Sequence, residues 1–294
     1  MPDLKRILFF ALFACQQNSI AGTIELNWTG CDSSRTAYVG DLANAYSQKT
    51  GIQINLRAGN ASTGIREVHD GLADIGGTSR YLLVDDPRES GIELVPVAWD
   101  ALVIIVHRDN PVVDISLEQL KAIYSGKTTN WSALGGDNRN IELFTQKSRF
   151  SGTGRTLREL LFANAKKYLP ASRTFESVIE LEQAIAQNPD AIAVTGVSSA
   201  RLGDFKIISL DGVEPSVENI KNGTYALYRP LYLAYSPASP NADAVKDFIS
   251  YVNSKTGRDV MHANGVVPYR EAMSLVMKKV RENEASYQQL VDKN

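Results

Sequence analysis

The chain has 294 residues, which exceeds the usual size of one hydrophobic core and favours two lobes of ordinary size. Hydrophobic residues make up 44% of the chain and charged residues 22%, a composition that excludes both a disordered chain and a multi-span membrane protein. A formal net charge of −2 gives no electrostatic case for nucleic acid, or for an anionic membrane surface, as a partner.

The first residues have the layout of a secretory signal peptide. A basic pair, Lys5 and Arg6, precedes an apolar run that ends at Cys15, and a small-x-small cleavage site ends at Ala21. The run is too short to span a bilayer, so we expect residues 1–21 to be removed and the mature chain to be periplasmic. The alternative is a lipoprotein box ending at Cys15, which would leave that cysteine acylated and the chain anchored.

Cysteine usage limits the chemistry of the mature chain. Cys15 and Cys31 are its two cysteines, and removal of the signal peptide leaves Cys31 alone. One cysteine supports neither an intrachain disulfide nor a cysteine-based metal site. We expect no metal and no cofactor.

From Gly22 onward, short β-like runs alternate with helical patterns, which is typical of an α/β fold. Residues 23–26 begin a strand, and we expect a loop over 27–34. Apolar residues spaced three and four apart predict a helix over 39–50 that ends at a glycine. Alternation over 52–56 predicts a second strand, which leads through a hydroxyl-rich loop at 59–64 into another helix.

The remainder of the chain continues this alternation. The apolar run 101–106 suits a buried strand, and a capping box that starts at Ser116 predicts a helix. Ser151 leads into an amphipathic helix. Further strands and a late helix are expected at residues 141–144, 191–194, 231–235 and 244–252.

Three loops bring Ser, Thr and Gly residues to the starts of predicted helices, at 32–34, 61–64 and 151–154. An oxyanion needs convergent N–H and hydroxyl donors, and a helix N-terminus supplies N–H groups together with a favourable dipole. One such loop alone is typical of an ordinary N-cap. Three of them favour an anion site in a cleft between lobes.

Six segments match segments of one protein family, and they occur in the same order along the chain as in that family. They are residues 71–80 (GLADIGGTSR), 96–104 (PVAWDALVI), 109–111 (DNP), 123–136 (IYSGKTTNWSALGG), 151–153 (SGT) and 225–232 (YALYRPLY). Together they resemble the periplasmic phosphate-binding proteins of phosphate ABC transporters. The individual segments are short, and their common order gives the resemblance its specificity.

The resemblance implies a type II periplasmic binding protein fold, in which two α/β lobes with mixed sheets and helices on both faces are joined by two crossover strands. Lobe 1 would comprise residues 22–106 and 229–294, and lobe 2 residues 107–228. Such a cleft closes by hinge motion as ligand bridges the lobes. The implied function is to bind inorganic phosphate, as a monomer, and to deliver it to the membrane permease of an ABC transporter.

The resemblance also implies a ligand site. Ser151, Gly152 and Thr153 match the Ser-Gly-Thr that holds phosphate at a helix start in that family. The other expected ligand residues are Ser33, Ser34, Ala61, Ser62, Arg80, Asp100 and Lys147.

The chain departs from the family pattern at three of these positions. Lys147 stands where the family commonly has an arginine, and so lacks the bidentate fork. Ala61 stands where a serine is frequent, which leaves the role of that serine to Ser62, to Asn60 or to a backbone N–H alone. Arg80 stands where some relatives carry an aspartate that accepts the proton of phosphate, so we expect Asp100 to be this acceptor. Such a carboxylate favours protonated phosphate over sulfate.

Other functions stay open. His69, His107 and His262 are the three histidines, and none has the sequence setting of a catalytic triad or a metal site. A secreted phosphatase is therefore disfavoured, and we expect no enzyme. Sulfate, molybdate or arsenate would fit an oxyanion site, and a secreted phosphate-sensing module would use the same fold.

Overall fold

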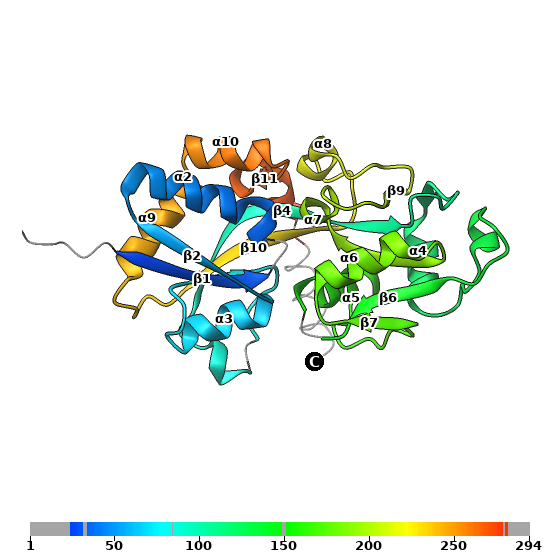
Figure 1. The fold of residues 1–294 in the computed structure, drawn as a ribbon, viewed down its shortest axis with the longest axis horizontal. Coiled ribbons are helices and arrows are strands. Elements are labelled where there is room, and N and C mark those ends of the chain that lie inside the picture. Colours follow the sequence, from blue (N-terminus) through cyan, green and yellow to red (C-terminus); the bar gives the residue numbers. More distant parts are fainter. Residues whose placement is uncertain (1–23, 32–33, 84, 149–150, 279, 282–294) are drawn as a thin grey trace, which may run out of the picture.

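The computed structural model describes residues 24–31, 34–83, 85–148, 151–278 and 280–281. It has two lobes side by side (Figure 1). The expected signal peptide and Ser33 lie outside the described residues. Within the described ranges, no helix combines the length and the apolar character needed to cross a membrane.

Lobe 1 is a mixed sheet between helices. Strands β1, β2 and β3 are parallel, and β10 runs antiparallel to β3. The strands are β1 (Glu25–Cys31), β2 (Gln53–Gly59), β3 (Ile75–Thr78), β10 (Tyr228–Tyr235) and β11 (Val267–Pro268). The helices are η1 (Arg35–Val39), α2 (Gly40–Thr50), α3 (Ala61–His69), η2 (Pro87–Glu89), α9 (Ala242–Val252), α10 (Lys255–Ala263) and η4 (Tyr269–Glu271).

Lobe 2 repeats this plan. Strand β6 runs parallel to both β7 and β8, and β9 runs parallel to β5. The strands are β5 (Asp114–Ile115), β6 (Glu142–Gln146), β7 (Arg173–Phe175), β8 (Ala191–Gly196) and β9 (Lys206–Leu210). The helices are α4 (Leu117–Tyr124), η3 (Trp131–Leu134), α5 (Gly152–Phe162), α6 (Val178–Gln187), α7 (Val197–Ala200) and α8 (Val217–Lys221).

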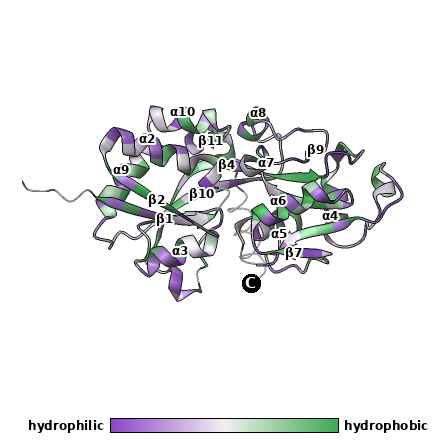
Figure 2. Cartoon of the chain, viewed as in Figure 1, coloured by the Kyte–Doolittle hydropathy of each residue, from purple (hydrophilic) through white to green (hydrophobic). Residues whose placement is uncertain are grey.

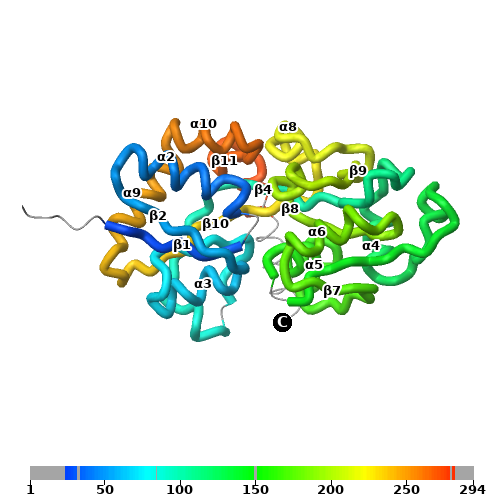
Figure 3. Tube along the Cα trace, in the orientation of Figure 1, coloured from blue at the N-terminus to red at the C-terminus, as the bar shows by residue number. Residues whose placement is uncertain are grey.

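Two strands cross between the lobes (Figure 3). The long strand β4 (Glu93–Val106) pairs with β10 through Ala101, and from Leu102 onward it pairs with β8. The chain returns at the start of β10, where Tyr228 pairs with Ala101. The change of partner therefore places Leu102–Val106, which we expected in lobe 1, in the sheet of lobe 2.

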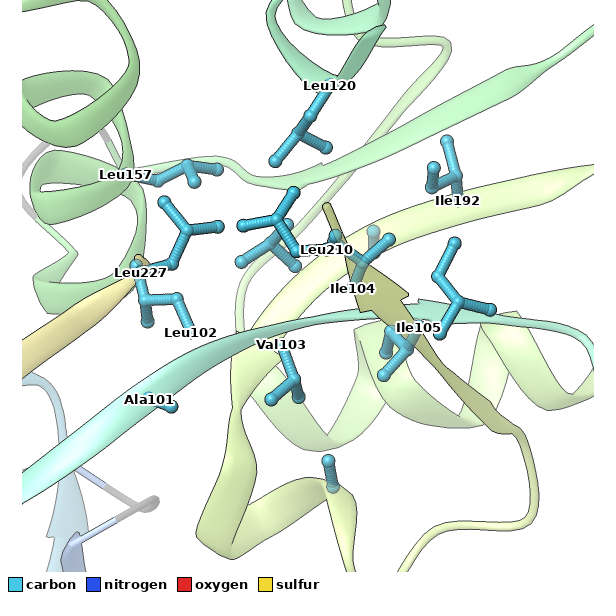
Figure 4. Close-up of a cluster of buried hydrophobic side chains, with 14 of the residues drawn as sticks. Ala101, Leu102, Val103, Ile104, Ile105, Leu120, Leu157, Ile192, Leu210 and Leu227 are labelled. Carbon is cyan, nitrogen blue, oxygen red and sulfur yellow. The ribbon is translucent and has the colours of Figure 1, made fainter. Parts of the chain in front are cut away.

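Buried side chains form separate cores on the two sides of this crossover. In lobe 2 the apolar run of β4 is fully buried and packs against Leu120 of α4, Leu157 of α5 and Ile192 of β8 (Figure 4). In lobe 1 one face of the sheet packs on α2 and α9, and the other face on α3. Figure 2 shows hydrophobic strands inside more hydrophilic helices and loops in both lobes.

The structure confirms the mixed α/β class and shifts two expected boundaries. Strand β1 runs on to Cys31, through residues that we expected in a loop, because Gly30 packs directly on Gly77 where any Cβ would overlap the backbone. Helix α3 begins at Ala61, earlier than expected, because the side chain of Asn60 caps its first turn. Small and polar residues hid both elements from a periodicity search.

Candidate functional site

A cavity of about 290 Å³ lies where the two lobes meet, and both lobes line it. From lobe 1 come Cys31, Ala58, Gly59, Asn60, Ala61 and Ser79. From lobe 2 come Gln146, Ser151, Gly152, Thr153, Glu176, Ser177 and Val178. Glycine, small side chains and hydroxyls make up most of this wall, so backbone N–H groups lie close to its surface.

Three helices begin at the cavity. The Asn60 side chain at the start of α3 accepts hydrogen bonds from two backbone N–H groups, at 2.9 and 3.0 Å. Ser151 caps α5 by accepting from Gly154 N–H at 3.0 Å, and Ser177 caps α6 by accepting from Glu180 N–H at 3.2 Å. Each N-terminus carries a partial positive charge, so three dipoles favour an anion in this space.

Ser79 is one of the residues through which lobe 1 contacts lobe 2. Its carbonyl oxygen accepts a hydrogen bond from Thr156 Oγ1 of α5 at 3.3 Å. Gly152 packs so closely against the Ser79 side chain that a Cβ on the glycine would overlap Ser79 Oγ. A glycine at this helix start therefore permits the lobes to come together.

A buried ion pair stands behind this contact. The Arg229 guanidinium, on β10, donates from Nε and Nη2 to Asp100 Oδ2 at 3.1 and 2.8 Å. Its Nη1 donates to Ser79 Oγ at 3.2 Å and to Thr153 Oγ1 at 3.0 Å. Ser198 Oγ donates to the other carboxylate oxygen of Asp100 at 3.1 Å. Both oxygens of Asp100 thus have protein partners.

Arg80 belongs to a second buried pair, within lobe 1. Its Nη1 and Nη2 donate to the two oxygens of Glu89 at 2.9 and 2.6 Å, and Nη2 also donates to Ser62 Oγ at 2.8 Å. Burial raises the pKa of Glu89, but the bonds from Arg80 and from Leu83 N–H, with the charges of Arg80 and Arg66, bring it below its ordinary value. Arg80 therefore braces the wall behind α3.

Lys147 is exposed near the cavity, where its ammonium group donates to Glu176 at 2.5 Å. The hydrogen bond and charge of Glu176 raise the pKa of Lys147. Glu176 itself lines the cavity, so the lysine offsets the negative charge that would otherwise oppose an anion.

The structure brings four of the expected ligand residues to the cavity wall: Ala61, Ser151, Gly152 and Thr153. Ser34 and Ser62 are buried just behind it, where Ser34 Oγ lies 2.9 Å from Cys31 Sγ.

The structure does not place Arg80, Asp100 or Lys147 on the wall. The reason is the same for all three, since each is held by an oppositely charged side chain. The placement of Asp100 therefore gives no support to its expected role as acceptor of a ligand proton.

Sequence reasoning missed several wall residues. Ser79, on the wall, lay inside a matching segment, and Arg229, which contacts Ser79 from behind the wall, lay in the return strand, but neither had been assigned a role. Ser177 opens a capping box with Glu180, the signal that could have revealed the third helix start. Among the described residues, no group of three His, Cys, Asp or Glu side chains is arranged to hold a metal ion.

Comparison with known proteins gives consistent relatives. The family model of the PBP superfamily domain matches residues 26–256. Over 225 residues the chain is 27% identical to the phosphate-binding protein PstS of Bacillus subtilis, covering 73% of this chain and 71% of that protein. It is 28% identical over 242 residues to PstS of Pseudomonas aeruginosa, covering 74% of each.

Solved structures agree with these sequence relatives. A substrate-binding protein from Clostridium perfringens, assigned to phosphate ABC transport and solved with bound phosphate, is 27% identical and superimposes with a TM-score of 0.75. The match covers 83% of this chain and 99% of that one. An ABC-type phosphate transport receptor from Vibrio cholerae is 25% identical, with a TM-score of 0.65, over 82% and 99% of the two chains. The chain therefore belongs to the PBP superfamily domain family and is a relative of the phosphate-binding proteins of ABC transporters.

Proposed function

We propose that this chain binds inorganic phosphate in the cavity between its lobes and delivers it to the membrane permease of an ABC transporter. The observation that carries the proposal is the convergence of three helix N-termini, α3, α5 and α6, on one small cavity. Relatives that match over 71% and 74% of their own length are named as phosphate-binding proteins. The export signal expected at residues 1–21 agrees with a periplasmic location.

The ligand contacts that we propose come from both lobes. The start of α3 offers the backbone N–H of Ala61, because the N–H groups of Ser62 and Thr63 already donate to Asn60. The start of α5 offers the N–H groups of Gly152 and Thr153 and the hydroxyls of Ser151 and Thr153. A dianion held by several charge-assisted hydrogen bonds out of water can reach submicromolar affinity.

We infer binding without turnover. His69 and His262 are paired with Asp70 and Glu271, His107 lies near Asp109, and none of the three lines the cavity. The described cavity wall therefore offers no imidazole base beside its hydroxyls. Sustained release of product from a chromogenic phosphate ester would contradict this inference.

Calorimetric titration of the purified, ligand-stripped protein with phosphate and with sulfate tests the proposal. We expect one phosphate per chain with submicromolar affinity and much weaker sulfate binding. Millimolar or absent phosphate binding would refute it, and tight binding of sulfate or molybdate instead would assign the site to another oxyanion. A monomer by light scattering is expected in both the free and the bound state.

A further inference from the structure

The guanidinium of Arg229 touches both lobes beside the cavity. It sits on the crossover strand β10, and its side chain is 0% exposed. From there Nη1 reaches Ser79 Oγ of lobe 1 and Thr153 Oγ1 of lobe 2. Its other donors are anchored on Asp100, which Ser198 holds in turn.

The protonation of these groups fixes which way the hydroxyls point. An arginine side chain has donors and no acceptor, so both hydroxyl oxygens must accept from Nη1. Each hydroxyl keeps one proton, which it can give to another acceptor. Ser79 and Thr153 both line the cavity, so an oxyanion there is an acceptor within the reach of each.

The same bonds depend on the lobes being together. Ser79 and Thr153 belong to different lobes, and opening the cleft would separate at least one of them from Nη1. Arg229 and Ser79 are both in lobe 1, so closure adds the bond from Nη1 to Thr153 and sets the Thr153 hydroxyl as a donor beside that of Ser79.

We propose that Arg229 is a positioning residue that couples lobe closure to oxyanion binding, by holding Ser79 and Thr153 so that their hydroxyl protons face the ligand. This inference rests on the proposed function, because it needs an anion in the cavity. Arg229 supplies no ligand contact of its own. It donates to the oxygens of both hydroxyls, so that each hydroxyl proton is free to donate to the ligand.

A purely structural ion pair between Arg229 and Asp100 would predict different behaviour. Such a pair would affect folding stability, but the contribution of Thr153 to ligand affinity would not depend on it. A thermodynamic cycle between the pair and Thr153 separates the two roles.

The experiment uses a neutral pair, Arg229→Gln with Asp100→Asn, because removal of one partner would leave a buried charge unpaired. Phosphate affinity is measured by calorimetry for wild type, the neutral pair, Thr153→Val, and the combination. Thr153→Val alone should weaken phosphate binding about 10- to 100-fold, and the neutral pair at least about tenfold. In the neutral-pair background, Thr153→Val should weaken phosphate binding by a further factor of less than about three.

Glu182→Gln provides the matched control, because this buried carboxylate of lobe 2 accepts from Thr195 and Ser199 and does not line the cavity. In that background Thr153→Val should keep its full effect. The inference would be overturned if the losses of phosphate affinity from the neutral pair and from Thr153→Val simply multiplied. It would also be overturned if the folded neutral pair bound phosphate as tightly as wild type.

Arg229→Lys is a second route that needs no neutral pair. The ammonium keeps the charge facing Asp100 but loses the fork that also reaches Ser79 and Thr153. We expect phosphate affinity to fall about tenfold, and wild-type affinity would overturn the inference. Failure of wild-type protein to bind phosphate refutes the proposed function itself, and is thereby distinguished from failure of the inference alone.

Discussion

Among the described residues each lobe buries one glutamate, and the two carboxylates are held in opposite ways. Glu89 in lobe 1 receives two bonds from the Arg80 guanidinium and one from Leu83 N–H at 2.8 Å. Glu182 in lobe 2 receives its bonds from hydroxyls, Thr195 at 2.5 Å and Ser199 at 2.9 Å. In lobe 1 the buried carboxylate of Glu89 is paired with a guanidinium. In lobe 2 the buried carboxyl group of Glu182 has only neutral hydroxyl partners among the described residues.

The pKa values of the two groups diverge for this reason. Burial raises the pKa of Glu182, and the two hydroxyl bonds offset only part of that effect. In Glu89 the bonds and charges of the arginines outweigh burial, and the pKa falls. Neither arrangement leaves a positive charge free to meet the ligand. This agrees with our proposal that helix N-termini and hydroxyls, and not a side-chain cation, bind the anion.

Glu89→Gln should give the largest loss of stability. The substitution keeps the shape but leaves Arg80 as a buried cation without its counter-ion, which typically costs about 3–5 kcal/mol. Chemical denaturation at neutral pH measures the free energy of unfolding. We expect a correspondingly lower midpoint and little change in the denaturant slope.

Glu182→Gln is the matched control in the other lobe. Its amide can still bond both hydroxyls, so the free energy of unfolding should change by less than about 1 kcal/mol at neutral pH. Equal losses for the two variants would show that the contrast between the lobes has no energetic meaning.

Gly152→Ala should act on ligand binding through the contact between the lobes. The new methyl group overlaps Ser79 Oγ and comes within 3.3 Å of Ala61 Cβ, both in lobe 1. Ser79 cannot turn aside without losing its bond from Arg229. Closure becomes costly, and phosphate affinity measured by calorimetry should fall at least about tenfold, or about 1.4 kcal/mol.

Gly40→Ala controls for the exchange itself, since Gly40 is also the first residue of an 11-residue helix. A Cβ there meets nothing nearer than a carbonyl oxygen at 3.4 Å. Its phosphate affinity should match wild type. If Gly152→Ala also binds as wild type does, the close contact between the lobes is not needed for the bound state.

Periodicity predicted most of the fold because most elements have one clear buried face. The helix that ends at Gly51, the capping box at Ser116 and the apolar strand at 101–106 were all confirmed. What failed were segments whose structure depends on distant partners. Strand β1 continues through Gly30 because Gly77 lies against it, and no local pattern carries that information.

The site was predictable in its neutral part and not in its charged part. Loops of hydroxyl residues and glycine indicate helix starts because capping is local in the sequence. Ser151 to Thr153 were predicted in this way, and they lie on the cavity wall. The charged residues have partners far away in the sequence: Asp100 pairs with Arg229, and Lys147 with Glu176. A sequence alone does not show whether a charged residue faces a ligand or is paired with a counter-ion elsewhere in the fold.

The smallest expected effect is a difference between the two glutamates in how their contributions to the free energy of unfolding depend on pH. This difference follows directly from the contrast between the lobes. The folded pKa of Glu182 is raised, so its contribution to stability is complete below the unfolded value of about 4.3 and is lost as pH rises through the folded value. The folded pKa of Glu89 is lowered, so its contribution is present above the unfolded value and is lost as pH falls through the folded value.

Urea unfolding at several pH values tests these opposite signs. Relative to wild type, Glu182→Gln should gain free energy of unfolding as pH rises above the unfolded pKa of the glutamate, because the amide removes the cost of ionising a buried acid. The deficit of Glu89→Gln should instead shrink as pH falls below the unfolded pKa of the glutamate toward its lowered folded pKa, because the wild type then loses the contribution of its carboxylate. Parallel pH profiles for the two variants would mean that both lobes hold their carboxylates in the same protonation state, and that the hydroxyls of Thr195 and Ser199 stabilise an ionised glutamate as well as Arg80 does.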